Sequence, residues 1–304
     1  MPTPPRPLSR TAARLAAVVA LVALAGCGSP FEVELPQAPP RLVLQSLFAA
    51  DSVLTVGVLQ SAPAGAAGGA PSGPVTTASV TVLEDGVAVG QAAYVPARLR
   101  YVSDVTVRAG RRYGVRVTAP GFDAAEAEDA VPLPVPFTLD VVEGAPPEPG
   151  AGRVDAVTLR FTRPADEAFL SLYGLVQRPP DAGGPASPLP FRSADPLLAD
   201  GDLTGRLFDV DDPFYQRAFF RVAAPVGPEV ALQVNVVRAL DAGAPAGPRE
   251  SLRLAALSPT YYAYARARAA DDEGIFDTPR ALPSNVTGGY GVFAAFAATE
   301  RVLP

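Results

Sequence analysis

Apolar and polar residues alternate with a period of two along much of the chain after Arg41, and turn-forming Gly, Pro and Asp residues separate the alternating runs. A period of two places successive side chains on opposite faces of an extended strand, so this pattern predicts strands. The clearest runs are 105–108, 113–118, 157–162 and 230–237. Short strands with turns at this spacing predict a mainly β fold that begins with an immunoglobulin-like β-sandwich.

Turn chemistry divides the alternating runs. Asp85-Gly86 lies between the apolar runs 75–83 and 87–89, and this dipeptide favours a tight hairpin because Gly takes a positive φ at little cost. The segment from Val131 to Pro136 contains three prolines, which lack a backbone donor, and it is therefore predicted to be a sheet edge or an interdomain segment. Three further segments lack periodicity and are predicted loops, namely 61–74, 179–190 and 241–247.

With 304 residues, the chain is long enough for two modest domains. Gly144 to Gly152 is rich in Pro and Gly and is the best candidate boundary. This places the β-sandwich domain at residues 41–143 and a second β-rich domain at residues 153–304. In the second domain, the runs 219–226 and 230–237 are predicted to pair around Gly227-Pro228.

One helix is predicted near residues 259–270, at the end of the second domain. Ser258 is a good N-cap, and Pro259 suits the first helical position. Acidic residues after Ala270 oppose the negative C-terminal end of a helix, so the helix is expected to stop there. Tyr261 and Tyr264 are predicted to pack on the sheet at helical spacing. Tyr262 is predicted to point away from the sheet and is a candidate ligand-binding residue.

The first thirty residues have the pattern of a secretory signal. Arginines occur up to Arg14, an apolar run of Leu, Ala and Val extends from Leu15 to Leu24, and small residues lead to Cys27. Leu24-Ala25-Gly26-Cys27 matches the bacterial lipobox. The sequence therefore predicts a lipoprotein signal peptide over residues 1–26, lipidation of Cys27 with palmitate-type chains, and a lipidated Pro-rich tether over residues 27–40.

Anchoring is expected to depend on lipid, because the apolar run is shorter than the roughly 20 residues that span a bilayer. Two acyl chains of about 14 methylenes contribute on the order of 20 kcal/mol of membrane affinity. Gly28 and Ser29 follow the cysteine, where an Asp would favour retention in the inner membrane. The predicted location is therefore the outer membrane.

Composition excludes several kinds of chemistry. The chain has no His and no Trp, its one Cys is Cys27, and its formal net charge is −6. Without His, neither a Ser-His-Asp triad nor a His-ligated zinc site can form. The acidic balance argues against a nucleic-acid partner. Carboxylate chemistry and binding without catalysis remain open, and no cofactor is expected.

The densest acidic cluster inside a predicted domain contains Asp209, Asp211 and Asp212. These carboxylates are candidates for ligand binding, for oxygen ligation of Ca²⁺, or for glycoside hydrolysis by a carboxylate pair. The EF-hand pattern is not met, because Phe214 and Phe220 stand where Gly and Glu are required. A solvated turn before Pro213 is the simpler interpretation, so no metal site is predicted.

The sequence resembles a Bacteroidota-type outer-membrane lipoprotein family known as domain of unknown function 4249. The residues that carry this resemblance are Cys27 in its lipobox, 78–82 before 84–86, 110–113, Leu257-Ser258 with the tyrosines 261, 262 and 264, 284–286, and 289–293. The resemblance implies an envelope protein, often beside TonB-dependent receptors. The family offers no catalytic residues to transfer.

We therefore expect an outer-membrane-anchored lipoprotein that is not an enzyme and acts as an accessory or binding module. The expected partners are the membrane, through the lipid on Cys27, and a TonB-dependent receptor. Two alternatives remain, a carboxylate-dependent hydrolase active on glycans and a structural or adhesive envelope protein. Carboxylates paired across a deep cleft would favour the hydrolase, whereas a flat face with exposed aromatic residues would favour binding.

Overall fold

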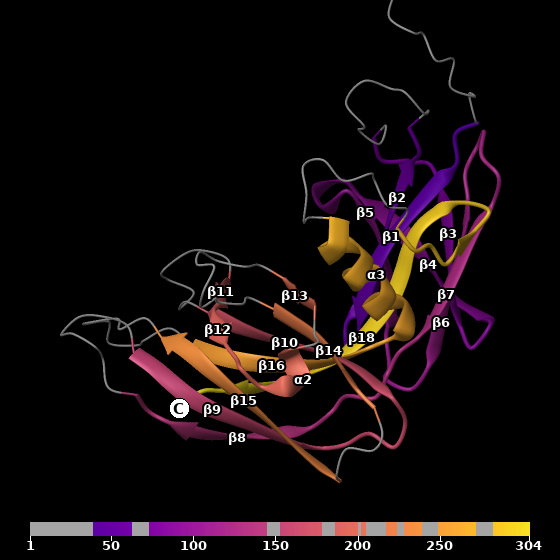
Figure 1. Cartoon of the computed structure of the whole chain (residues 1–304). Coiled ribbons are helices and arrows are strands. Elements are labelled where there is room, and N and C mark those ends of the chain that lie inside the picture. The colour runs from indigo at the N-terminus through magenta and orange to yellow at the C-terminus, as the bar shows by residue number, and fades with distance from the viewer. Residues whose placement is uncertain are drawn as a thin grey trace, which may run out of the picture. The chain divides into compact units, whose positions relative to one another are not determined.

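Strands account for most of the ordered elements, so the prediction of a mainly β fold with a helix near the C-terminus is confirmed. The structure, a computed structural model, describes residues 39–62, 73–144, 153–177, 186–199, 202–204, 217–223, 228–238, 249–271 and 282–304. Within these ranges the strands form one sheet of 14 strands and one of 4 strands (Figure 1).

The first half of the chain contributes seven strands to the larger sheet. They are β1 (Leu42–Ala49), β2 (Val53–Gln60), β3 (Ser79–Glu84), β4 (Val87–Val95), β5 (Arg100–Thr106), β6 (Arg112–Thr118) and β7 (Ala125–Ala130), with the short 3₁₀ helix η1 (Pro96–Arg98) between β4 and β5. The predicted hairpin is confirmed, because β3 and β4 are joined at Asp85-Gly86. Both turn residues have positive φ, 50° and 82°, as a type I′ turn requires.

The second half of the chain contributes strands to both sheets. The larger sheet continues with β10 (Ala168–Gln177), β11 (Ser187–Leu189), β13 (Asp202–Thr204), β14 (Arg217–Val222), β16 (Arg249–Leu257), β17 (Val286–Thr287) and β18 (Tyr290–Val302). The smaller sheet has the order β12 (Phe191–Arg192), β15 (Glu229–Arg238), β9 (Arg153–Thr162) and β8 (Phe137–Val142). The helices described here are α2 (Pro196–Ala199) and α3 (Pro259–Asp271).

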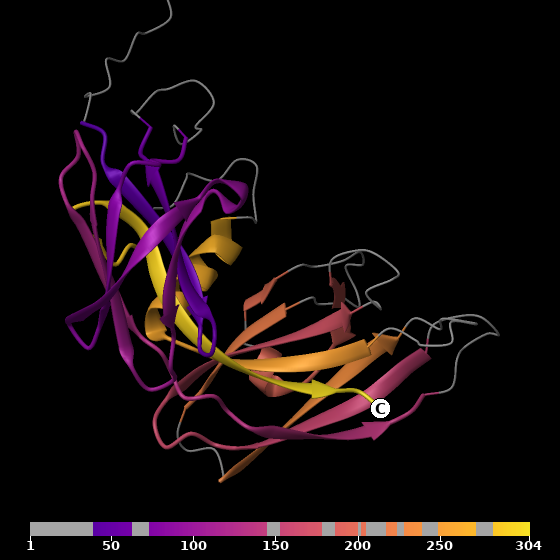
Figure 2. The same cartoon turned by 180° about the vertical axis from the view of Figure 1, so that it is seen from behind.

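The C-terminal strand β18 joins the two halves of the larger sheet, because it pairs with β1 on one side and with β16 on the other. Figures 1 and 2 both show β18 beside the N-terminal strand β1. This pairing runs parallel from Val43 opposite Tyr290 to Ala49 opposite Phe296, whereas the other strand pairs among the described residues are antiparallel. The predicted last strand, 292–296, lies in the first half of the longer strand β18.

Three apolar clusters hold the sheets together. One lies within the first-half strands and includes Phe293 of β18. A second lies between the smaller sheet and one face of β10, β14 and β16. The third lies on the opposite face of those strands, under α3 (Figure 1). On β15, Val230, Leu232, Val234 and Val236 are all buried, which confirms that they share one face.

Two predictions about the second half are wrong. The predicted pair 219–226 and 230–237 does not form, because β14 pairs with β10 and β13 while β15 pairs with β9 and β12. Alternation shows which face of a strand is buried, but it does not identify the partner strand. The predicted loop 179–190 contains β11, which pairs with β10, and Pro188 is tolerated there at the edge of the sheet.

The predicted division into domains at 41–143 and 153–304 stays a prediction about independent folding. Strand pairing crosses it, because β8 pairs with β9 and β1 pairs with β18. The residues from Pro39 to Pro304 cluster as one compact unit. The segment from Val131 to Pro136 is not an edge strand, which was one of its two predicted roles, and it connects β7 to β8.

Candidate functional site

The larger of two described grooves, which we call the proline groove, has a volume of about 620 Å³. The connection between β7 and β8 forms one wall, the β9–β10 turn forms another, and the junction of β16 with α3 forms the third. The lining residues are Ala130, Pro132–Pro136, Thr162–Phe169 and Ala256–Pro259. Most of these side chains are apolar, so the groove suits an apolar ligand surface.

The wall from Pro132 to Pro136 combines an exposed apolar side chain with backbone groups that no other described segment pairs. Leu133 is 69% exposed, which is high for an apolar side chain. In the described part of the chain, backbone hydrogen bonds tie Val131 to Arg111 and Gly110, and none ties residues 132–136 to another segment. Proline has no donor but keeps its carbonyl. The wall therefore offers backbone acceptors beside an apolar surface.

Behind this groove, the N-terminus of α3 is fixed by two polar side chains. The Ser258 Oγ accepts a hydrogen bond from the Tyr261 backbone N–H at 3.1 Å, which confirms the predicted N-cap. Asp129 of β7 accepts from the Ala295 N–H at 2.9 Å and from the Ala130 N–H at 3.0 Å. Burial raises the pKa of the Asp129 carboxyl although several hydrogen bonds act in the opposite direction. The Ser258 hydroxyl and the Asp129 carboxyl are therefore engaged in holding the fold together.

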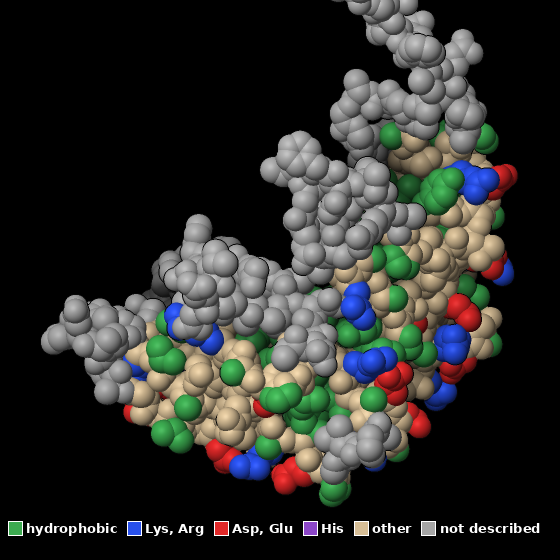
Figure 3. All heavy atoms as spheres, in the orientation of Figure 1, with side chains coloured by type: hydrophobic (Ala, Val, Ile, Leu, Met, Phe, Trp, Pro, Cys, Tyr) green, Lys and Arg blue, Asp and Glu red, His purple; other side chains and the backbone are tan. Residues whose placement is uncertain are grey.

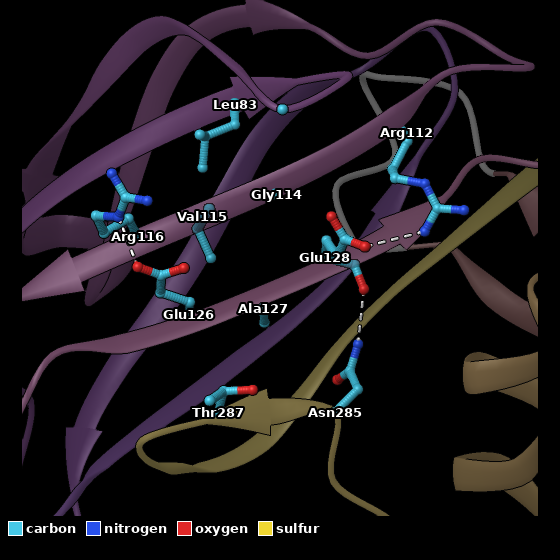
Figure 4. A pocket seen from close by; sticks show the side chains of 11 residues that line it. Leu83, Arg112, Gly114, Val115, Arg116, Glu126, Ala127, Glu128, Asn285 and Thr287 are labelled. Atoms are coloured by element: carbon cyan, nitrogen blue, oxygen red, sulfur yellow. Dashed lines mark hydrogen bonds and ion pairs between the residues drawn. The ribbon is translucent and has the colours of Figure 1, made fainter.

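A second groove, the charged groove, lies over β6, β7 and β17 and has a volume of about 420 Å³ (Figure 4). Its lining includes two cross-strand ion pairs, Arg116 with Glu126 at 2.6 Å and Arg112 with Glu128 at 3.2 Å. Gly114 lies between the two pairs (Figure 4). All four charged side chains are more than half exposed, so each pair contributes only about 0–1 kcal/mol to stability.

The amide side chain of the charged groove, Asn285, makes hydrogen bonds within the fold. Its Nδ2 donates to the backbone oxygens of Glu128 and Phe293, and its Oδ1 accepts from the Phe293 N–H at 3.0 Å. Asn285 therefore ties β7 to β18 below the short strand β17. Every charged or amide group that we find here already has a protein partner, so the groove is less suited to binding than the proline groove.

Tyr262 does not point away from the sheet, so the prediction that it is exposed is wrong. It is 9% exposed and its ring centre lies 4.8 Å from that of Phe169 on β10. Tyr261 is buried as predicted and packs edge-to-face on Phe296, and Tyr264 packs against the same cluster. The reason is that aromatic residues of the sheet contact α3 on more than one stripe of its surface, so that neighbouring positions 261 and 262 are both buried.

The other predicted site residues, Cys27, Asp209, Asp211 and Asp212, lie outside the described residues. Sequence reasoning missed Arg217 at the start of β14, which lies over the rings of Tyr173, Phe219 and Tyr261. No sequence signal pointed to it, because a lone Arg before an apolar run is common. Among the described residues there is no group of three acidic, His or Cys side chains placed to hold a metal ion.

On the described face in Figure 3, basic and acidic side chains are interspersed and do not form a large patch of one sign. This agrees with the many Arg–Glu and Arg–Asp pairs along the strands, such as Arg160 with Asp140 at 2.8 Å. Neither described helix is long and apolar enough to cross a bilayer.

Comparison with known proteins shows a family and a distant similarity to solved structures. The family described as "Domain of unknown function (DUF4249)" matches residues 28–301. No curated protein matches the chain. A solved structure described as a membrane-anchored protein from Corynebacterium diphtheriae is 12% identical, with 73% of this chain and 55% of that chain covered and a TM-score of 0.19. The chain thus spans about half the length of that protein (55%), and a similarity this low carries no argument.

Proposed function

Because the chain belongs to the family described as domain of unknown function DUF4249, we propose that it is an outer-membrane-anchored lipoprotein acting as a non-catalytic binding module. The anchor is the lipid on Cys27, and the binding surface is the proline groove. The partner we propose is a TonB-dependent outer-membrane receptor, a step that rests on the family resemblance alone.

The observation that carries the binding function is the combination of features in the proline groove. It has an apolar lining, an exposed Leu133, and backbone carbonyls between Pro132 and Pro136 without a backbone partner in the described chain. An extended segment of a partner chain can donate its N–H groups to such carbonyls while its apolar side chains enter the groove. We therefore propose an extended, apolar segment of the receptor as the occupant.

The hydrolase alternative has less support from the described residues. A glycosidase needs one protonated and one ionised carboxyl group facing each other across the scissile bond. In the charged groove, Glu126 and Glu128 lie two residues apart on one exposed strand face, and each is occupied by an ion pair with an arginine. These carboxylates are thus poorly placed to face each other across a scissile bond.

Site-specific photo-crosslinking in native membranes tests the docking surface. A photoreactive amino acid at Leu133 is expected to capture a TonB-dependent receptor, identified by mass spectrometry. The matched control is the same amino acid at Val87, which is 65% exposed compared with 69% for Leu133 and lies in the β3–β4 hairpin, away from the groove residues.

Two results would contradict this proposal. Equal capture from both positions would indicate non-specific contact, and capture of no receptor from Leu133 would remove the proposed partner. Saccharide hydrolysis that is lost in Asp209→Asn or Asp211→Asn would support the hydrolase instead.

A further inference from the structure

Arg217 occupies an unusual position on the α3 face of the larger sheet. Its guanidinium carbon lies 4.8 Å from the ring centres of Tyr173 and Phe219 and 5.7 Å from that of Tyr261. These rings come from β10, β14 and α3, so three elements hold one cation. Each cation–π contact contributes about 0.5–2 kcal/mol, depending on how far water is excluded.

A buried hydroxyl fixes the remaining freedom of the side chain. Arg217 Nε donates to Ser171 Oγ at 2.7 Å, and Ser171 is 0% exposed. Ser171 lies on β10, two residues before Tyr173, so both side chains are on the same face of the sheet. The rotamer entropy that an arginine normally loses on binding a ligand is therefore already spent in the fold.

Arg217 differs from Arg153, Arg238 and Arg253, which are also partly buried, in its lack of a counter-ion among the described residues. Arg153 and Arg238 are paired with Asp155, and Arg253 is paired with Glu300 at 2.7 Å. No carboxylate among the described residues lies within ion-pair distance of Arg217, and its contacts with these residues use only Nε and the ring faces. The N–H groups on its Nη nitrogens therefore have no acceptor among the described residues and are available to donate to a bound ligand.

We propose that Arg217 is the centre of a binding site for an aromatic carboxylate. The Nη edge of a guanidinium presents parallel N–H groups that match the two oxygens of a carboxylate. The neighbouring rings provide an apolar surface for a planar body, and Tyr173 is the half-buried ring among them. This site is separate from the proline groove, and the inference does not depend on the proposed receptor.

Fluorine NMR on the lipidated protein in lipid nanodiscs tests this site with 4-fluorobenzoate as the probe and empty nanodiscs as the blank. The carboxylate is expected to bind, while the neutral 4-fluorobenzamide is not. Arg217→Met is expected to weaken binding by about 10-fold to 100-fold, the range for hydrogen bonds to a charged group. Arg217→Lys should recover only part of this loss, because a lysine lacks the planar fork.

The control is Arg221→Met, on the same strand, whose arginine is 61% exposed and paired with Glu167. It should leave binding unchanged. Ser171→Ala keeps the cation and loses only its positioning bond, so it should weaken binding less than Arg217→Met does. Three results would each overturn the proposal. They are equal affinity for 4-fluorobenzamide and 4-fluorobenzoate, unchanged affinity for 4-fluorobenzoate in Arg217→Met, and tighter binding of 4-fluorophenylphosphonate than of 4-fluorobenzoate. Circular dichroism confirms that each variant is folded, and if Arg217→Met is not, the Ser171→Ala result decides.

Discussion

At the scale of single residues, Asp129 is the polar side chain most dependent on its surroundings. Its Oδ1 and Oδ2 each accept a backbone N–H, from Ala130 and Ala295, and Oδ1 also lies 3.4 Å from the Thr260 hydroxyl of α3. A single buried carboxylate thus links β7, β18 and the start of the helix. Such a group stabilises the fold by accepting hydrogen bonds from backbone N–H groups that would otherwise be buried without a partner.

Asp129→Asn is expected to lower the free energy of unfolding by about 1–3 kcal/mol, because the amide NH₂ must face one of the two N–H donors. Urea unfolding followed by circular dichroism measures this change. The control is Asp140→Asn, whose carboxylate is exposed and paired with Arg160, and it should change stability by less than about 1 kcal/mol.

The difference in unfolding free energy between wild type and Asp129→Asn should depend on pH in one direction. Because burial holds the pKa of Asp129 above its ordinary value, the folded protein binds a proton more readily than the unfolded chain. The associated stabilisation is complete below the unfolded pKa of about 3.9 and is lost as pH rises through the folded pKa. The stability difference between wild type and Asp129→Asn should therefore narrow as pH rises through this window, and a difference that widens would contradict the assignment.

Residue-level predictions from sequence succeeded where the cause is local. Ser258 and the Asp85-Gly86 turn were predicted because a cap or a turn depends on a few neighbouring residues. Tyr262 was misplaced because its burial depends on Phe169, which is almost one hundred residues away. Asp129 was missed because β7, Ala-Glu-Ala-Glu-Asp-Ala, buries small alanines between acidic residues and has no strong apolar signal.

At the scale of secondary-structure elements, the parallel pairing of β1 with β18 depends on glycine. Gly291 has φ of +111°, and a Cβ added there would overlap the carbonyl oxygen of Leu44 on β1. Gly289 approaches the carbonyl oxygen of Leu42 in the same way. The backbones of the two strands thus come together where a side chain would hold them apart.

Gly291→Ala is expected to destabilise the protein by about 2–4 kcal/mol, since it adds a steric clash to the cost of a positive φ. Gly86→Ala separates the steric clash from the cost of a positive φ. Gly86 has φ of +82°, but no atom lies within 4 Å of a Cβ added there. It should cost only the conformational part, about 1–2 kcal/mol. Thermal unfolding of the two variants measures the difference, and equal losses would mean that the close approach to Leu44 is relieved at no cost.

The same elements show why strand pairing was harder to predict than strand location. Period-two alternation located most of β15, because alternation follows from which face is buried. The partner strands were not predictable in this way. β1 and β18 stand at opposite ends of the chain, and the consecutive strands β14 and β15 belong to different sheets.

At the scale of the whole molecule, buried charge joins the two sheets. Arg238 of β15 in the smaller sheet pairs with Asp155 of β9 and with Glu250 of β16 in the larger sheet, and it donates to the carbonyl oxygen of Pro304 at 2.8 Å. Removing one member would leave an uncompensated buried charge. This cluster was not predicted, because its three charged residues, Asp155, Arg238 and Glu250, are separated by up to 95 positions in the sequence. Only the folded topology brings them together.

The membrane attachment of this body is the property that sequence predicts most directly. Only Cys27 offers a thiol, so Cys27→Ser removes the atom that we propose carries the thioether lipid. The tether over residues 27–40 can extend by at most roughly 45 Å at about 3.5 Å per residue, which would hold the β-rich unit close to the membrane and within reach of a membrane receptor.

Labelling cells with radioactive palmitate is therefore expected to mark the wild-type protein and not Cys27→Ser, and fractionation should find the unlabelled variant away from the outer membrane. The control is Ser29→Ala, two residues beyond the lipobox cysteine, which should remain labelled and in the membrane fraction. Because acyl chains contribute about 0.8 kcal/mol per buried methylene, their loss leaves the chain without a comparable anchor. Label that persists on Cys27→Ser would show that lipid is attached elsewhere, and membrane retention without label would show that another part of the chain holds it there.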